Sequence, residues 1–254
     1  MKRTLMYGLA VLALALLLAP APAPAEDGGN VARVAYWTIR DGHVADFEAG
    51  LAAHNQLHVA QKDPHPLLTW EIVSGKRTGQ YIRGSFGHEW ADFDQEAANA
   101  EADAADSAKN LDPHIASAEP VFGVARPELS NPPSGPPSGV SQVIYFHVNQ
   151  GMAQQFVGAI KKVHAALGKV EGGWPSYLWY DLASGSLPTY VLSLPRANWA
   201  GFAPGDPSLF DAVAAEYGPE DAQSIFAEFS AAVEHQHAFF SVFRGDLSYM
   251  PASE

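Results

Sequence analysis

Two histidines four residues apart are the first side chains in this sequence whose types and spacing suggest chemistry. His54 and His58 lie in the segment 43–61, whose apolar residues recur at helical spacing, and residues four apart on a helix point in the same direction. A pair of imidazoles on one helix face suits a divalent metal ion. The alternative is a half-buried face, on which each ring bonds to a carbonyl group or to water. We therefore predict His54 and His58 as catalytic residues or metal ligands, and the alternative stays open.

A metal ion would need a further ligand from another segment. The candidates are His114, His147 and Glu71, because imidazole and carboxylate are common ligands of zinc. No spacing in the sequence selects one of them, so the third ligand is left open.

A second group of candidate residues lies on predicted strands. The alternation of the segment 142–148 places Tyr145 and His147 on one face, and an earlier predicted strand carries Tyr36 and Thr38 in the same way. A cavity lined by these side chains could stack a planar aromatic ligand, and His147 would titrate near neutral pH. The alternative is a filled interior, in which the tyrosine hydroxyls bond to each other. The predicted ligand-binding residues are Tyr36, Thr38, Glu71 and Tyr145, and His147 is a third catalytic candidate.

Two further histidines, His235 and His237, are separated by a single residue. The segment 207–235 is predicted to be helical, with a break near Gly218-Pro219. Rings near a helix end need not converge, so we assign this pair a favourable charge at a helix C-terminus rather than a ligand role.

The segments that contain these candidate residues belong to a sequence repeat that occurs twice in the chain. Six residues recur at a constant offset of 109 positions (143 − 34), which indicates a duplicated unit. The first copy carries Val34, Tyr36, Trp37, Ile39, Gly42 and Phe47, and the second carries Val143, Tyr145, Phe146, Val148, Gly151 and Phe156. At this offset His54 matches Val163 and His58 matches Leu167, so the imidazole pair is specific to the first copy.

Both copies predict the element order β-α-β-β-α-β. In the first, strands are expected at 34–39, 68–73, 81–86 and 121–125, with helices at 43–61 and 91–109. In the second, strands are expected at 142–148, 176–182, 189–194 and 239–244, with helices at 152–170 and 207–235. The segment 127–139 has five prolines and two glycines, which is typical of a linker. The predicted units are therefore 31–126 and 140–249.

This order is the ferredoxin-like arrangement. Two such units, each opening with Val-x-Tyr-aromatic-x-aliphatic and then glycine and a helix, resemble the dimeric α+β barrel superfamily over roughly residues 31–249. The resemblance implies an α+β fold in which two tandem ferredoxin-like units pack sheet to sheet as an intrachain barrel. Members include cofactor-free monooxygenases acting on aromatic polyketides, haem-degrading enzymes, chlorite dismutases, dye-decolorising peroxidases and stress-responsive proteins. No member's catalytic motif maps onto this sequence, and a fold alone assigns no reaction.

The composition disfavours several function classes. A formal net charge of −13 at pH 7 opposes binding to phosphate backbones, so we expect no nucleic-acid partner. The sequence has no cysteine, which excludes disulfides and thiolate metal sites. GxSxG, Walker, dinucleotide-fingerprint and HExxH motifs are missing from the sequence, which disfavours covalent hydrolases, nucleotide enzymes and zincins.

The N-terminal segment 1–25 has the pattern of a secretory signal peptide. Lys2 and Arg3 precede an apolar run over 5–18, and Ala23-Pro24-Ala25 supplies small residues at a cleavage site. We expect a periplasmic or secreted protein without stable membrane insertion after cleavage. An uncleaved anchor is the alternative.

These patterns predict an exported small-molecule-binding protein, with an oxygenase-like or haem-handling activity in a barrel cavity lined by tyrosine and histidine. Haem or a divalent metal ion would be the cofactor. The alternatives are a non-catalytic binding protein, a stress-related structural module, and a metal-binding protein with histidine ligands. The sequence leaves open whether the protein is an enzyme, and whether it is a monomer or a homodimer.

Overall fold

The computed structural model describes residues 29–94, 99–137 and 139–251, so the predicted signal peptide lies outside the described residues. The first unit contains β1 (Val31–Ile39), α1 (Val44–Gln61), β2 (Leu67–Ile72), β3 (Tyr81–His88), α2 (Ala100–Asn110) and β4 (Ile115–Ala125). The second contains β5 (Val140–Val148), α3 (Ala153–Leu167), β6 (Leu178–Leu182), β7 (Thr189–Arg196), α4 (Leu209–Tyr217), α5 (Pro219–Ala232) and β8 (Val233–Phe243). Over the described ranges, none of the helices has the length and apolar character that a membrane span requires.

The strands form one closed barrel in the order β1-β3-β2-β8-β5-β7-β6-β4. Each unit supplies four neighbouring antiparallel strands, and the two units join where β2 pairs with β8 and β4 pairs with β6. Closure pairs both edges of each unit's sheet, which removes the exposed edges that an open sheet would have. The predicted α+β fold, two tandem ferredoxin-like units forming one barrel, is confirmed.

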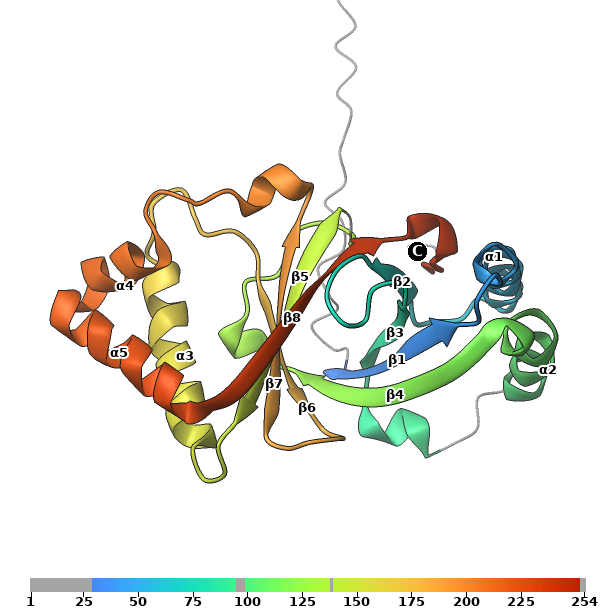
Figure 1. Ribbon diagram of the computed structural model, residues 1–254, viewed down its shortest axis with the longest axis horizontal. Helices are drawn as coiled ribbons and strands as arrows, with labels where there is room; N and C mark the ends of the chain where they lie inside the picture. The colour runs from blue at the N-terminus through green and yellow to red at the C-terminus, as the bar shows by residue number, and fades with distance from the viewer. Residues whose placement is uncertain (1–28, 95–98, 138, 252–254) are drawn as a thin grey trace, which may run out of the picture.

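The helices cover the barrel from opposite sides: α1 and α2 lie against the first unit, and α3, α4 and α5 lie against the second (Figure 1). Phe47 of α1 and Phe156 of α3 occupy equivalent positions in the repeat, and both are fully buried. Phe47 packs against Tyr81 with ring centroids 4.9 Å apart, and Phe156 packs against Tyr190 at 4.7 Å. The same helix-to-sheet contact therefore anchors both halves of the core.

A glycine turns the chain from the first strand into the first helix of each unit. Gly42 has a φ angle of +79° and Gly151 has one of +83°. Residues with a Cβ atom rarely adopt this left-handed conformation, which explains why glycine recurs at this position of the repeat.

Strands β4 and β8 each begin six residues earlier than the sequence predicts (121 − 115 and 239 − 233). His235 and His237 lie inside β8, so the prediction that they sit at a helix end is wrong. This part of β8 is exposed and polar and is held by backbone pairing with β5, so it lacks the apolar alternation that marks a strand.

The second helical region differs from the prediction in the first unit and has the predicted break in the second. The helix expected at 91–109 begins only at Ala100, after a short 3-10 helix at Trp90–Phe93. The predicted break near Gly218-Pro219 is confirmed, since α4 ends at Tyr217 and Pro219 is the first residue of α5, a position that proline favours.

The described part of the proline-rich segment 127–139 packs against the rest of the chain. Leu129 is buried in the core of the second unit, and Asn131 forms an isolated bridge with Tyr177. Pro133 and Pro137 reach the interior of the barrel. The segment thus contributes to the wall of the barrel as well as joining the two units.

Candidate functional site

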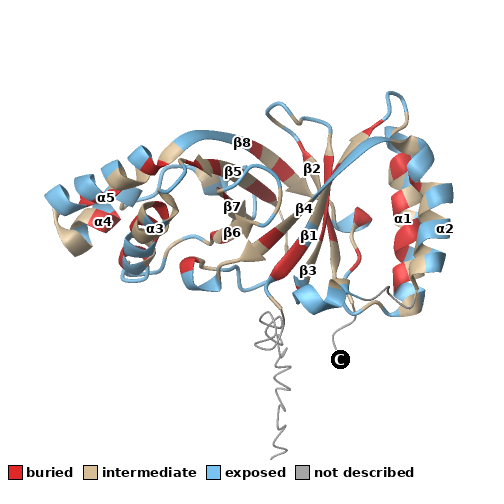
Figure 2. Cartoon of the chain, turned by 90° about the horizontal axis from the view of Figure 1, so that it is seen from below, coloured by how far each residue is buried: buried red, intermediate tan, exposed pale blue. Residues whose placement is uncertain are grey.

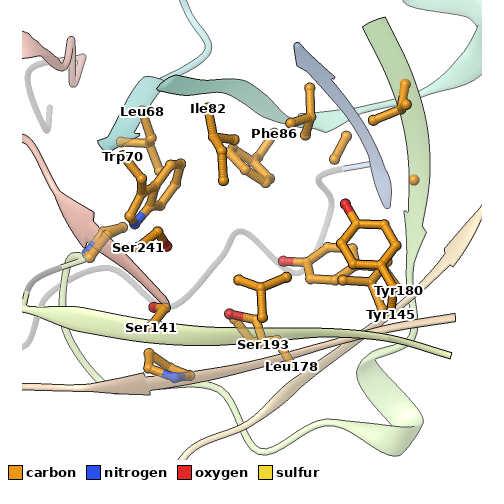
Figure 3. Close-up of a pocket in the computed structure, with 18 of the residues that line it drawn as sticks. Leu68, Trp70, Ile82, Phe86, Ser141, Tyr145, Leu178, Tyr180, Ser193 and Ser241 are labelled. Atoms are coloured by element: carbon orange, nitrogen blue, oxygen red, sulfur yellow. The ribbon is translucent and has the colours of Figure 1, made fainter. Parts of the chain in front are cut away.

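The barrel contains a partly open cavity of about 330 Å³, at the lower end of the size range of small-molecule sites. Strands of both units line it, and Figure 3 shows Leu68 and Trp70 on one side with Tyr145 and Tyr180 on the other. Apolar side chains make most of the wall, including Val34, Leu68, Trp70, Phe86, Val143 and Leu178. Hydroxyl-bearing side chains supply the polar groups, namely Tyr36, Tyr145, Tyr180, Ser141, Ser193 and Ser241. Such a lining favours an apolar, aromatic ligand with few polar groups.

Tyr36 and Tyr145 join the two units inside the barrel. They are equivalent in the repeat, both line the cavity, and their hydroxyl groups form a hydrogen bond with each other. The guanidinium carbon of Arg77 lies 4.5 Å from the ring centroid of Tyr36, within the range of a cation–π contact. Burial raises the pKa of both tyrosines, so both are neutral phenols at neutral pH. The bonded tyrosine pair and an open cavity, which the sequence presented as alternatives, occur together.

Tyr180 is a cavity residue that the sequence analysis missed. Burial alone raises the pKa of its hydroxyl to about 12, and among the described residues this hydroxyl has no hydrogen-bond partner. A constant repeat offset matches Tyr180 to Glu71 and Trp179 to Trp70. In the structure, however, Trp70 lines the cavity while Trp179 packs against the helices of the second unit. The register of β6 is shifted by one residue against the repeat offset, because Trp70 pairs with Ile82 whereas Tyr180 pairs with the equivalent Val191. Alternation within β6 alone would have placed Tyr180 beside Leu178 on the inner face.

The other predicted ligand-binding residues lie outside the cavity. Oγ1 of Thr38 accepts a hydrogen bond from Nε2 of Gln80 at 2.9 Å. A carboxylate oxygen of Glu71 is 3.2 Å from the guanidinium of Arg244. Of the four residues predicted to bind a ligand, the cavity therefore contains the two tyrosines.

His147 lies on the same strand face as Tyr145 but beyond the cavity. Its Nδ1 is 3.0 Å from Oγ1 of Thr189, and its ring stacks on His235 with centroids 4.1 Å apart. Burial, and then the neighbouring His235, lower the pKa of His147. The neutral imidazole is thus favoured, and its hydrogen-bond partner among the described residues is Thr189, which does not line the cavity.

His54 and His58 do meet, but on the outer side of α1 that faces α2 rather than in the barrel. Their Nε2 atoms are 3.0 Å apart, and the third group beside them is the carboxylate of Asp103 on α2. Of the third ligands suggested by the sequence, His114 instead has its Nδ1 3.0 Å from Nδ1 of His43. Asp103 gave no signal in the sequence, because only the packing of α2 on α1 brings it to the histidines.

The donor set of the cavity does not fit haem. Protein ligands to haem iron are imidazole, thiolate, thioether or tyrosinate groups, and the described lining contains no His, Cys or Met. Its tyrosines have raised pKa values, which disfavours the tyrosinate form. No Lys or Arg of the described residues lines the cavity to pair with haem propionates.

Comparison by sequence finds no matching family model and no matching curated protein. Solved structures do resemble the chain. A candidate monooxygenase from Lactobacillus acidophilus aligns with a TM-score of 0.56 and 12% identity, over 87% of this chain and 96% of that chain. A candidate monooxygenase from Fusobacterium nucleatum aligns with a TM-score of 0.51 and 7% identity, over 85% and 93%. A mutant chlorite dismutase from Candidatus Nitrospira defluvii aligns with a TM-score of 0.53 and 11% identity, over 86% and 92%.

At these identities the likeness concerns the fold and not the activity. The chain has the fold of the dimeric α+β barrel superfamily, with both ferredoxin-like halves in one polypeptide. The fold and the cavity together define a barrel protein with an apolar, tyrosine-lined chamber of ligand size.

Proposed function

We propose that the protein binds a small planar aromatic molecule with a polar substituent inside the barrel. The observation that carries this proposal is the hydroxyl of Tyr180, which lines a mostly apolar cavity of about 330 Å³. An apolar wall favours an aromatic body by removing it from water, at about 25 cal/mol per Å² of buried apolar surface. A hydroxyl without a protein partner favours a ligand that hydrogen-bonds to it, since a ligand that displaces water from this hydroxyl and leaves it unpaired binds at a cost.

The other aromatic residues support a planar ligand. Trp70 lies across the cavity from Tyr180 (Figure 3), so a flat ring system between them can make stacked or edge-to-face contacts. The hydroxyls of Tyr36 and Tyr145 already bond to each other, which leaves Tyr180 as the tyrosine best able to recognise the polar group.

Oxygenation of the bound aromatic molecule is a second candidate function. The tyrosine pair supports it, because the phenol groups of Tyr36 and Tyr145, with Arg77 over the Tyr36 ring, could stabilise negative charge that develops on a phenolic substrate. The candidate monooxygenases from Lactobacillus acidophilus and Fusobacterium nucleatum have the same barrel fold, which agrees with this function without assigning it.

A pair of matched ligands tests the binding function. Naphthol and naphthalene have the same apolar body, and only naphthol can bond to Tyr180. We expect Tyr180→Phe to weaken naphthol binding about fivefold, which corresponds to about 1 kcal/mol for one neutral hydrogen bond, and to leave naphthalene binding unchanged. Titration calorimetry measures both affinities.

The control is Tyr217→Phe, which makes the same chemical change at a hydroxyl outside the barrel that donates to the carbonyl of Lys162. It should change neither affinity. If naphthol does not bind to the parent protein, or binds Tyr180→Phe equally well, the proposed recognition is wrong. Oxygen consumption in the presence of naphthol then separates an oxygenase from a binding protein.

Export is a proposal that rests on the N-terminal segment. The basic residues Lys2 and Arg3, the apolar run over 5–18 and the small residues at 23–25 support it. Mass spectrometry of the protein produced with its native N-terminus should find a chain that begins after Ala25. An intact N-terminus on the accumulated protein would contradict export by cleavage.

A further inference from the structure

A second cluster of polar side chains lies outside the barrel, between α1 and α2. The Nε2 atoms of His54 and His58 are 3.0 Å apart, and Oδ1 of Asp103 is 3.3 Å from the first and 3.5 Å from the second. Both imidazoles are buried, with exposed fractions of 4% and 5%. Three atoms that can each offer a lone pair therefore meet at one point.

The outer ring nitrogens determine where the imidazole protons lie. Nδ1 of His54 is 3.1 Å from Oδ2 of Asp106, and Nδ1 of His58 bonds to Oδ2 of Asp63. A carboxylate can only accept, so each Nδ1 is a donor and each neutral imidazole keeps its lone pair on Nε2. The inner atoms then face one another as acceptors, and Oδ1 of Asp103 is buried without a hydrogen-bond partner among the described residues. Such a cluster requires a cation or additional protons.

The spacing of the three inner atoms matches a zinc site. Zinc binds imidazole nitrogen at about 2.0–2.1 Å, so ligands at the corners of a tetrahedron lie about 3.3 Å apart. The observed separations of 3.0, 3.3 and 3.5 Å bracket that distance. Carboxylates that accept from the outer nitrogens are also the usual partners of metal-bound histidines.

The charge around the cluster also favours a divalent cation. The carboxylates of Asp63, Asp103 and Asp106 surround the two imidazoles, and the nearby positive groups are the guanidinium of Arg83 and the ammonium of Lys109. Arg83 also donates to Oδ1 of Asn55 at 2.6 Å. With neutral imidazoles, the three carboxylates exceed these two positive groups by one charge (3 − 2), and a bound divalent cation would offset this excess.

Helix α2 has little apolar packing of its own to hold it in place. None of its residues is buried, whereas α1 beside it has several buried residues (Figure 2). In the second unit the positions of His54 and His58 are taken by Val163 and Leu167, which belong to the apolar clusters between the helices and the sheet. An ion that bridges α1 and α2 would take over the role of that apolar contact in the first unit.

We propose that His54, His58 and Asp103 bind one Zn²⁺ ion, with water in the fourth position, and that the ion fastens α2 to α1. The Asp103 side chain is 40% exposed, which gives the ion a path from solvent. None of the three ligands lines the barrel cavity, so this site is independent of the proposed function.

Calorimetric titration with Zn²⁺ tests the site on the full chain after treatment with EDTA. The parent protein should bind one equivalent, and Asp103→Asn should lower the affinity at least tenfold because an amide is a poorer zinc ligand. Co²⁺ should give the visible absorption of a tetrahedral complex in the parent and lose it in Asp103→Asn. Hydrogen exchange should slow in α2 when Zn²⁺ is added, and should not change in α5.

Two other groups of histidines serve as controls. His43 lies beside Asp46 and His114, and His65 lies beside His88 with Asp92. His43→Ala and His65→Ala should both retain the parent affinity, which would assign binding to the proposed ligands. If the EDTA-treated parent binds no Zn²⁺, or Asp103→Asn binds it as tightly as the parent, the cluster is a protonated histidine pair and the proposal fails. Asp103 lies on α2, the outer helix, so Asp103→Asn should fold. The zinc titration can therefore be carried out on this variant even if His54→Ala does not fold.

Discussion

The hydroxyl groups of Tyr36 and Tyr145 form a hydrogen bond across the barrel, although the two residues are 109 positions apart in the chain. They are the same position of a duplicated unit, so the bond lies where the two copies meet. Because both copies belong to one polypeptide, a single chain supplies both tyrosines of this pair. The pair lies beside the cavity.

Removal of the two hydroxyls should have coupled effects on the free energy of unfolding. Removing one hydroxyl leaves the other buried and unpaired, which costs about 1–3 kcal/mol, whereas removing both can be nearly neutral. We therefore expect Tyr36→Phe and Tyr145→Phe to destabilise the protein singly, and the double variant to recover part of the loss. Urea unfolding measures the three values, and strictly additive losses would contradict the coupling.

Filling the cavity should abolish binding with a limited cost in stability. Val143 lines the cavity and is only partly buried, so Val143→Phe should place its ring in open space. We expect naphthol affinity to fall at least tenfold, and the free energy of unfolding to change by no more than about 1–3 kcal/mol. Unchanged affinity in a folded variant would mean that naphthol binds elsewhere.

The two tryptophans that the repeat pairs should respond differently to a ligand. Trp70 lines the cavity and Trp179 packs against the helices. We expect naphthol to change the fluorescence of the parent and of Trp179→Phe, and to leave the fluorescence of Trp70→Phe nearly unchanged. If the fluorescence change is instead lost in Trp179→Phe and kept in Trp70→Phe, the inner face of β2 has been misidentified.

An ion pair on the surface should make a small contribution to stability that depends on pH. The bond from Arg244 holds the pKa of Glu48 below its ordinary value of about 4.5. The carboxylate therefore stabilises the folded state above that pH, and the contribution disappears as the pH falls through the lowered pKa. Glu48→Gln should cost no more than about 1 kcal/mol near pH 7, because the pair is partly exposed.

Unfolding of the parent and of Glu48→Gln, measured between pH 7 and pH 3, checks this account. The difference between them should shrink as the solution is acidified. A difference that grows toward low pH would have the wrong sign for a carboxylate with a lowered pKa.

The repeat in the sequence predicted the fold and the position of Tyr36 and Tyr145 in the barrel interior, because both follow from local patterns copied at a fixed offset. The bond between the two hydroxyls was predicted only as part of the alternative with a filled interior. Tyr180 was missed because β6 is shifted by one residue against that offset, so that Tyr180 and not Trp179 takes the place of Trp70 in the barrel. A constant offset predicts the order of the elements, but a shift of one residue in a strand reverses which side chain it predicts to face the interior.

Asp103 illustrates a different limit of the sequence. The pairing of His54 with His58 could be predicted from helical spacing, because one helix determines it. The third group comes from another helix, and only the crossing of α1 and α2 brings it within 3.5 Å of the imidazoles. His235 and His237 were misassigned for a related reason, since pairing with β5 extends β8 into a polar stretch.

The most direct test of the account is a crystal structure of the protein with naphthol. We predict electron density for the ligand inside the barrel between Trp70 and Tyr180, with its oxygen within hydrogen-bonding distance of the Tyr180 hydroxyl. An empty barrel, with naphthol bound only at the outer surface, would contradict the claim that this chamber is the binding site.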